Sequence, residues 1–202
     1  AKNSFNFAIN RIIQIIGISI SISGLLLLIS LLSYSPEDPN FIFPDNTKIK
    51  NILGFQGSFI SDIFFQSFGL ISLLIPFSFI FTGSNIFFKK KLLLIIESLF
   101  FTIIYSLFGS LFFSYFYPNA FKLYINGNGG FIGKFLDSTF LNSLINFNTQ
   151  ISYYTLIVTI IILFFISIKF KIYSFYQFSK RLYKFIFIKK AQNYTNENEI
   201  IN

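Results

Sequence analysis

The sequence predicts an all-α integral membrane protein with four transmembrane helices, both termini in the cytoplasm, and a short amphipathic interfacial helix before the fourth span. Composition supports this class because 53% of the 202 residues are hydrophobic, 12% are charged and 32 are Phe, more than the core of a soluble chain of this size would bury. Four apolar runs are each long enough to cross a hydrocarbon layer of ~30 Å. Lys and Arg are divided unevenly between the loops, which indicates the orientation.

The first apolar run covers residues 12–32 and follows a polar segment, residues 1–11, that we expect in the cytoplasm. No small-residue cleavage site follows the run, so we interpret it as an uncleaved signal anchor. Small or polar residues recur along one side of it at steps of three or four, a pattern typical of close helix packing. These residues are Gln14, Gly17, Ser21 and Gly24.

The first loop begins with a sequence typical of a helix start, because residues 35–38 read Ser-Pro-Glu-Asp, with a capping residue, a proline and two acids in order. Pro39 and Pro44 follow closely and prevent a longer helix. We therefore expect a single capped turn and then extended chain. Phe41 and Phe43 would be available to touch the membrane surface.

A glycine turn at residues 54–57 precedes the second apolar run, residues 58–82, which would extend roughly 37 Å as one helix. We expect this run to span the membrane with tilt. Asp62 is its only ionisable residue. Its small and polar residues fall on one side, which should face protein rather than lipid. They are Ser58, Asp62, Gln66, Gly69, Ser72 and Pro76.

The third apolar run covers residues 92–117 and follows three lysines, residues 89–91, in a connection so short that it predicts a tight hairpin. Glu97 lies inside this run. Its side chain could extend back toward Lys90 or Lys91, or it could face a polar stripe on its own helix. That stripe consists of Ser98, Thr102, Ser106 and Gly109.

The second loop contains a glycine cluster, residues 127–130, and leads into residues 131–145, where apolar and polar side chains occupy opposite faces of a helix. At roughly 22 Å this helix is too short to span and should lie along the interface. Residues 151–168 form the fourth span. Each half of the chain thus has a spanning helix, a loop with a glycine turn, and a helix leading into the next span, which suggests a weak internal repeat.

Twelve of the 16 Lys and Arg residues fall on one predicted side of the membrane, and the positive-inside rule makes that side cytoplasmic. The remaining four are Lys48, Lys50, Lys122 and Lys134. Residues 169–190 alternate bases with aromatics, which favours a juxtamembrane helix at the headgroups of anionic lipid over a nucleic-acid-binding segment. Residues 191–202 are polar and predict the disordered start of a linker.

The chain has no Cys and no His, so it lacks disulfides, thiolate metal sites and the commonest general base. No phosphate-binding loop or dinucleotide-binding glycine motif occurs in it. We therefore predict no catalytic site, metal site or cofactor in these residues.

Several short motifs follow one another between residues 31 and 76. They are Ser33-Tyr34-Ser35-Pro36-Glu37-Asp38-Pro39, Asn51-Ile52-Leu53-Gly54, Gly57, Ser61-Asp62, Phe68-Gly69 and Pro76, and a later turn reads Gly129-Gly130-Phe131-Ile132-Gly133. In order and spacing they resemble the four-helix membrane domain that opens the FtsK/SpoIIIE family of bacterial septal DNA translocases. The resemblance covers about residues 10–170, and it departs from the family pattern at Asn40-Phe41, at Ser58 and in a fourth span poorer in glycine.

This resemblance implies an anchor in the bacterial inner membrane that localises an ATPase motor to the division septum, recruits other division proteins, and serves cell division and chromosome partition. ATP and Mg would belong only to a downstream motor, which alone would contact DNA; neither that motor nor the family's DNA-orienting domain has a counterpart here. The chain itself would be no enzyme, and the resemblance leaves assembly as a homo-oligomer open. The residues expected to be structural or to mediate interactions are Pro36, Asp38, Pro39, Gly54, Gly57, Asp62, Gly69, Pro76, Gly129, Gly130 and Gly133.

A rival hypothesis is a small oligomeric transporter or channel that uses Asp62 and Glu97. These acids lie toward opposite sides of the membrane in the predicted topology, which argues against a direct pair. The reading frame after Asn202 would discriminate, because a phosphate-binding loop downstream would indicate the translocase.

Overall fold

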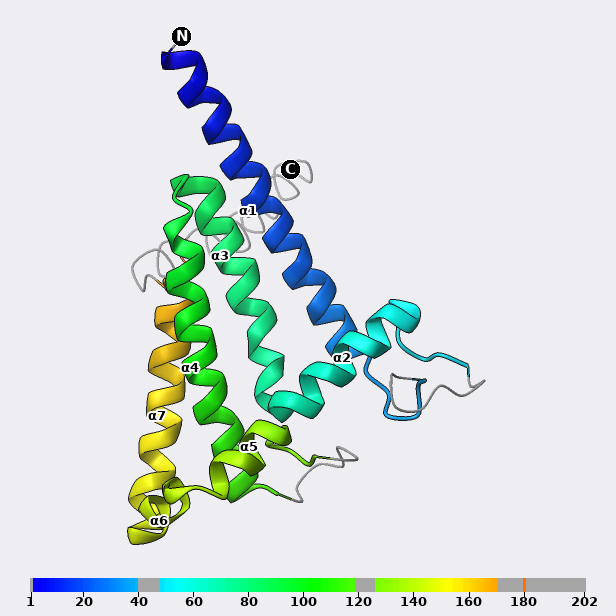
Figure 1. Ribbon diagram of the computed structural model, residues 1–202, viewed down its shortest axis with the longest axis vertical. Helices are drawn as coiled ribbons and strands as arrows, with labels where there is room; N and C mark the ends of the chain where they lie inside the picture. The colour runs from blue at the N-terminus through cyan, green and yellow to red at the C-terminus, as the bar shows by residue number, and fades with distance from the viewer. Residues whose placement is uncertain (1, 40–47, 119–125, 171–179, 181–202) are drawn as a thin grey trace, which may run out of the picture. The chain divides into compact units, whose positions relative to one another are not determined.

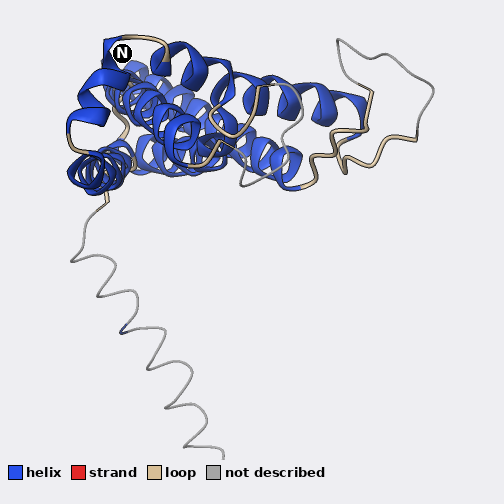
Figure 2. Ribbon diagram, turned by 90° about the horizontal axis from the view of Figure 1, so that it is seen from below, coloured by secondary structure: helices blue, strands red, loops and turns tan. Residues whose placement is uncertain are grey.

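The computed structural model describes residues 2–39, 48–118, 126–170 and 180. The chain divides into two units, Ala1–Lys169 and Phe170–Asn202, and the elements below all belong to the first. They are α1 (Lys2–Leu32), α2 (Gly54–Phe68), the 3-10 helix η1 (Gly69–Leu74), α3 (Ile75–Lys89), α4 (Leu93–Phe116), α5 (Gly130–Asp137), α6 (Phe140–Phe147) and α7 (Thr149–Ser167). No strand occurs among the described residues (Figure 2).

Four segments are long and apolar enough to cross a membrane: Phe5–Leu32, Gly54–Lys89, Leu93–Phe116 and Thr149–Ser167. The prediction of an all-α protein with four spans is therefore confirmed. α1 is longer than the apolar run that predicted it, because the polar residues from Lys2 onward are helical too. The predicted boundary between residues 11 and 12 thus lies inside a continuous helix.

The distribution of side chains is the reverse of that in a soluble protein. Large apolar residues such as Leu32, Phe140 and Phe147 are 71%, 73% and 93% exposed. The buried polar side chains are mostly hydroxyls, among which Ser61, Ser72 and Ser110 are fully buried. Small and hydroxyl residues between helices, with apolar residues outside, are the packing pattern of membrane helices.

In the helix bundle α1 packs along α3, and α4 lies between α3 and α7 (Figure 1). The contact of α1 with α3 is close because glycines stand on both sides: a Cβ at Gly17 would lie 2.7 Å from the carbonyl oxygen of Gly83. A Cβ at Gly24 would lie 2.9 Å from both the carbonyl oxygen of Pro76 and the backbone nitrogen of Ile80. The predicted role of this α1 stripe in helix packing is confirmed.

The second span is not the single straight helix that we expected over residues 58–82. It begins earlier, at Gly54, so the predicted glycine turn at residues 54–57 is instead the first turn of α2. It then breaks at Gly69, where φ is +70° and a six-residue 3-10 helix begins that leads into α3. Figure 1 shows α2 directed away from the axis of α3. The predicted polar side does face protein, since Ser58, Asp62, Gly69, Ser72 and Pro76 are buried.

The predicted interfacial helix over residues 131–145 is also divided, into α5 and α6. α5 ends at Asp137, and Thr139 caps the start of α6, because its hydroxyl oxygen accepts a hydrogen bond from the Leu141 N–H at 3.3 Å. A capping residue favours a helix start over a helix interior. Phe131, Phe135 and Phe140 are all at least 60% exposed, so the predicted apolar face is present on both helices.

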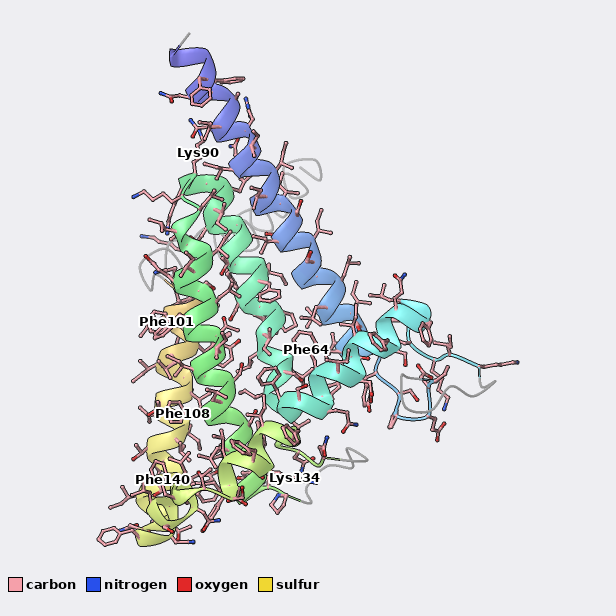
Figure 3. All side chains as sticks on the ribbon, in the orientation of Figure 1. Phe64, Lys90, Phe101, Phe108, Lys134 and Phe140 are labelled. Carbon is pink, nitrogen blue, oxygen red and sulfur yellow. The ribbon has the colours of Figure 1, made fainter. Side chains whose placement is uncertain are left out.

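The third span and its hairpin agree with expectation. Lys90 ends α3 in a left-handed conformation, with φ of 55°, and α4 begins three residues later at Leu93. Lys90 therefore stands at one end of the bundle, while Lys134 of α5 stands at the other (Figure 3). The expected extended chain at residues 40–47, the juxtamembrane helix and the disordered linker fall mostly or wholly outside the described residues.

Candidate functional site

The first loop is closed by Asp38, whose carboxylate is 3% exposed. One carboxylate oxygen accepts the backbone N–H of Lys50 and the other accepts that of Asn51, both at 2.8 Å. The Asp38 N–H in turn donates to the Ser35 carbonyl oxygen at 3.2 Å, so the predicted turn forms, without continuing into a helix. This arrangement, which we call the Asp38 clasp, fixes the start of the first loop to the residues just before α2.

Asn51 extends the clasp into the helices. Its side-chain N–H donates to the carbonyl oxygen of Ser30 in the last turns of α1, at 2.9 Å, and its side-chain oxygen accepts the Leu53 N–H at 3.1 Å. Ser30 donates its hydroxyl to the Gly57 carbonyl oxygen at 2.6 Å. A Cβ at Gly57 would collide with the Asn51 side-chain oxygen, so only glycine allows α2 to approach this closely.

The prolines of the motif have different surroundings. Pro36 is exposed in the turn, whereas Pro39 is buried and its carbonyl oxygen accepts the Ser58 hydroxyl at 3.1 Å. Pro76 is buried in the first turn of α3, where its missing N–H leaves no hydrogen bond unmade.

Asp62 is buried beside Tyr34, which lies two residues beyond the end of α1. One carboxylate oxygen accepts the Tyr34 hydroxyl at 3.1 Å and the Gln66 side-chain N–H at 3.4 Å. Burial, and then the charge of Asp62, raise the pKa of Tyr34 above its ordinary value, so the phenol remains a donor. These contacts tie the end of α1 to α2 through one acid.

Gln66 also reaches the second loop. Its side-chain oxygen accepts the Asn126 N–H, and its carbonyl oxygen accepts the Asn126 side-chain N–H, both at 3.3 Å. The two loops at this end of the bundle are therefore connected by one line of hydrogen bonds, which runs through Tyr34, Asp62, Gln66 and Asn126.

The break at Gly69 is matched to the glycine turn of the second loop. The Leu70 N–H donates to the Asn128 carbonyl oxygen at 2.9 Å, and a Cβ at Gly69 would collide with that same oxygen. Gly130, at φ +65°, faces the backbone of Ser67 and Gly69. Two glycine-bearing backbone segments from separate halves of the chain thus lie directly against each other, an arrangement we call the glycine junction.

Gly129 and Gly133 complete the glycine junction against α4. A Cβ at either position would collide with the carbonyl oxygen of Ser110. The Ser110 hydroxyl donates to the Phe68 carbonyl oxygen at 2.9 Å, which is freed because α2 ends there. Asn128 is 1% exposed and donates to the Tyr117 carbonyl oxygen, while its side-chain oxygen has no partner among the described residues.

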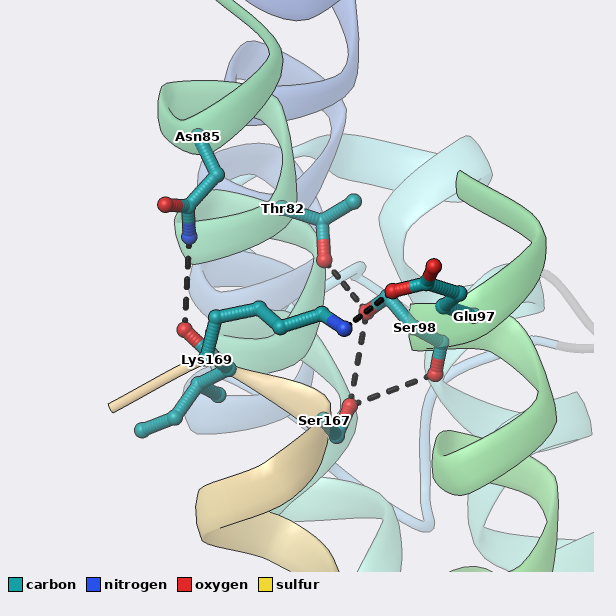
Figure 4. A network of polar contacts seen from close by, with 7 residues as sticks. Thr82, Asn85, Glu97, Ser98, Ser167 and Lys169 are labelled. Carbon is teal, nitrogen blue, oxygen red and sulfur yellow. Dashed lines mark hydrogen bonds and ion pairs between the residues drawn. The ribbon is translucent and has the colours of Figure 1, made fainter. Parts of the chain in front are cut away.

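A third polar group, which sequence reasoning missed, joins α7 to α3 and α4 near the hairpin end (Figure 4). Its centre is Ser167, whose hydroxyl lies 3.1 Å from that of Ser78 and 2.8 Å from that of Thr102. Ser98 bonds Thr82 and also contacts Ser167 at 3.4 Å. The i, i+4 spacing of Ser98 and Thr102 marked one face of α4, but no motif indicated the partner residue on α7.

Glu97 belongs to this end of the bundle, and its partner differs from both predictions. It forms an ion pair with Lys169, just beyond α7 (Figure 4), instead of bonding Lys90 or Lys91 or facing the polar stripe. The reason is that the last turn of α7 docks beside the first turns of α4 through Ser167. Asp62 contacts the first loop and α2, so the structure does not bring the two acids together.

Among residues 2–39, 48–118, 126–170 and 180, no group of three or more acids could hold a metal ion. What the polar contacts do is hold helices together: the Asp38 clasp, the glycine junction and the Ser167 group each join segments far apart in the sequence. These contacts fix the positions of the membrane spans and loops relative to one another.

Comparison with known proteins identifies the same region. Residues 10–178 match the family model described as the 4TM region of DNA translocase FtsK/SpoIIIE. The chain is 32% identical over 87 residues to the DNA translocase FtsK of Rickettsia prowazekii (strain Madrid E), covering 42% of this chain and 12% of that relative. It is 36% identical over 64 residues to the FtsK of Rickettsia typhi (strain ATCC VR-144 / Wilmington), covering 32% and 9%.

The chain therefore spans about a tenth of the length of the curated relatives it matches. No solved structure matches it. The family match covers most of the chain, from the first third of α1 past the end of α7, and so includes the Asp38 clasp, the glycine junction and the Ser167 group. This chain belongs to the family of the 4TM region of DNA translocase FtsK/SpoIIIE.

Proposed function

We propose that this chain is the membrane anchor of a DNA translocase and that it localises a motor to the division septum of the bacterial inner membrane. Its relatives are named DNA translocases, and the part of them that it matches is the membrane region. The chemistry of translocation, including ATP and Mg, would belong to a motor outside this region. The anchor would contribute by holding that motor at the septum.

The observation that carries this proposal is the rigid connection between the two loops at one end of the spans. The clasp, the line from Tyr34 to Asn126 and the glycine junction fix the first loop, α2, α5 and the end of α4 relative to one another. A surface held in this way can present one shape to other division proteins, because little conformational freedom remains to be lost on binding.

The opposite end carries the cationic hairpin at Lys89–Lys91, and Lys169 after α7. We infer that this end faces the cytoplasm, since bases accumulate there. Both chain termini would then lie on the side where DNA is found. A motor joined after residue 202 would be held close to the membrane at the site of division.

The test is to express the chain fused to a fluorescent protein in dividing bacteria that lack the endogenous translocase anchor. We expect fluorescence at the septum, with the Gly69→Ala variant inserted but no longer enriched there, and the Gly54→Ala variant enriched as in the parent. Uniform membrane fluorescence of the parent chain would contradict septal localisation. Turnover of ATP by the purified chain would contradict the view that it contributes position only.

A further inference from the structure

Two adjoining cavities lie along one side of α1. The larger, of about 400 Å³, is bounded by α1, α2 and Phe79 of α3; the smaller, of about 280 Å³, is bounded by α1, α3 and α4. Ser23 and Phe79 line both. We call the continuous depression the α1 groove and define it by Ile20, Ser23, Leu26, Phe79, Ile95 and Leu99.

The α1 groove lies within membrane-spanning segments, since its lining residues come from candidate spans. Its hydroxyls at Thr82 and Ser98 already bond each other, so they do not require water. An apolar groove at this depth is suited to a hydrocarbon chain. A cavity of about 280 Å³ holds less than one turn of a helix that, with its side chains, is roughly 10 Å across and rises roughly 5.4 Å per turn.

The hairpin end of the groove is close to three consecutive lysines. Thr82 precedes Lys89 by seven residues of α3, a rise of roughly 10 Å, and Ile95 lies in the first turn of α4, four residues after Lys91. The side chains of Lys90 and Lys91 are exposed, and Figure 3 shows Lys90 at that end. The nearby acid Glu97 forms its ion pair with Lys169, although its charge also interacts with those of Lys89 and Lys91.

We propose that the α1 groove is a binding site for an anionic phospholipid. One acyl chain lies in the groove between α1 and α4, over Phe79, and the phosphate lies against Lys90 and Lys91. The charge complementarity of the two lysines and the phosphate selects an anionic lipid over a zwitterionic one, and the length of the groove orders one chain.

The experiment uses the absence of Trp in the chain. The Phe79→Trp variant is reconstituted in phosphatidylcholine vesicles, and its fluorescence is quenched by increasing fractions of brominated phosphatidylglycerol or brominated phosphatidylcholine. We expect the phosphatidylglycerol to quench at a fraction several times lower. The Phe165→Trp variant, on the exposed side of α7 near the same end, should be quenched equally by both lipids. Leu99→Trp serves as a second probe of the groove if Phe79→Trp fails to fold.

Two further variants separate the contribution of the lysine charges to lipid binding from that of the shape of the groove. In the Phe79→Trp background, replacing Lys90 and Lys91 by Gln should reduce the preference for phosphatidylglycerol by roughly fivefold per base. Ser23→Leu should reduce quenching by both lipids because it fills the groove, whereas Leu25→Phe, which adds bulk on the opposite, lipid-exposed face of α1, should not.

Equal quenching of the groove probe by the two lipids would overturn the proposal, as would a preference that survives loss of both lysines. Protection of the probe from both lipids, accompanied by cross-linking between copies through α1, would show that a second chain occupies the groove and would also overturn it.

Discussion

Replacing Asp38 tests whether the clasp holds the first loop to the helices. Its two carboxylate oxygens each accept one backbone N–H at 2.8 Å, and the side chain is 3% exposed. A hydrogen bond to a charged group contributes about 1.5–3 kcal/mol. Asp38→Ala, which removes both acceptors and leaves two N–H groups unpaired, should therefore lower the free energy of unfolding by about 3 kcal/mol or more. Asp38→Asn keeps one acceptor and should lose about half of this.

The neighbouring acid provides the matched control. Glu37 pairs with Lys50 on the surface, and the two side chains are 66% and 61% exposed. The hydrogen bond to Lys50 lowers the pKa of Glu37, yet such an exposed pair is screened by water and contributes little. Glu37→Gln removes the same formal charge one residue away and should leave stability nearly unchanged.

The assay is equilibrium unfolding of the purified variants in mixed micelles of a mild detergent and a denaturing one, followed by circular dichroism. Limited proteolysis of the first loop gives a second measurement, because a released loop should be cut faster. If Asp38→Asn and Glu37→Gln lose the same stability and are cut at the same rate, the clasp does not hold the loop and the reasoning is refuted.

Three other predictions concern the same end of the bundle. Gly69→Ala should destabilise the protein by more than about 2 kcal/mol, because the added Cβ collides with the Asn128 carbonyl oxygen and φ is strained for alanine. Gly54→Ala, with open space around it, should lose only about 1 kcal/mol in the same unfolding assay. Equal losses would contradict the glycine junction. Asp62→Asn keeps the acceptor for Tyr34 and should be mild, while Asp62→Leu should lose about 1 kcal/mol for the hydrogen bond to Tyr34. A stable Asn variant that no longer localises would instead favour the transporter hypothesis. Because the pKa of Tyr34 is raised, its neutral form should stabilise the fold below pH 10.0, and this stabilisation should be lost as the pH rises through the raised pKa. An ultraviolet difference titration against Tyr34→Phe should show a tyrosine that ionises above pH 10.0. Ionisation at or below pH 10.0 would contradict the contact of Tyr34 with Asp62.

The four spans could be predicted because length and hydropathy are properties of each segment by itself. The third span and the fourth agree to within about two residues, since a short hairpin and Asn148 mark their starts. The packing of α1 through Gly17 and Gly24 was also predictable, because small residues at helical spacing indicate close contact.

The break at Gly69 was not predictable from the second span alone. Its cause is the backbone of Asn128, far along the chain in the second loop. Gly69 looked like one more small residue of a helix face, and nothing local marked it as a position with positive φ. The division of α5 from α6 had a local signal in Thr139, but the amphipathic pattern continued across it.

The Ser167 group and the ion pair of Glu97 with Lys169 were missed for a related reason. Ser98 and Ser167 are 69 residues apart, and Glu97 and Lys169 are 72 apart. Single hydroxyls on separate helices carry no spacing that relates them. Only the docking of α7 against α4 brings these groups together, and that docking depends on the whole bundle.

The central claim is a four-span anchor whose termini both face the cytoplasm, and cysteine accessibility tests it most directly. The chain has no native Cys, so single cysteines at Asn40, Ser84, Asn128 and Asn193 can be probed in intact cells with a membrane-impermeant thiol reagent. Because Asn128 is buried, labelling there is also measured after mild denaturation. The account predicts that cysteines at positions 40 and 128 react from outside and that those at 84 and 193 react only after the cells are opened. Labelling of position 193 in intact cells would contradict it.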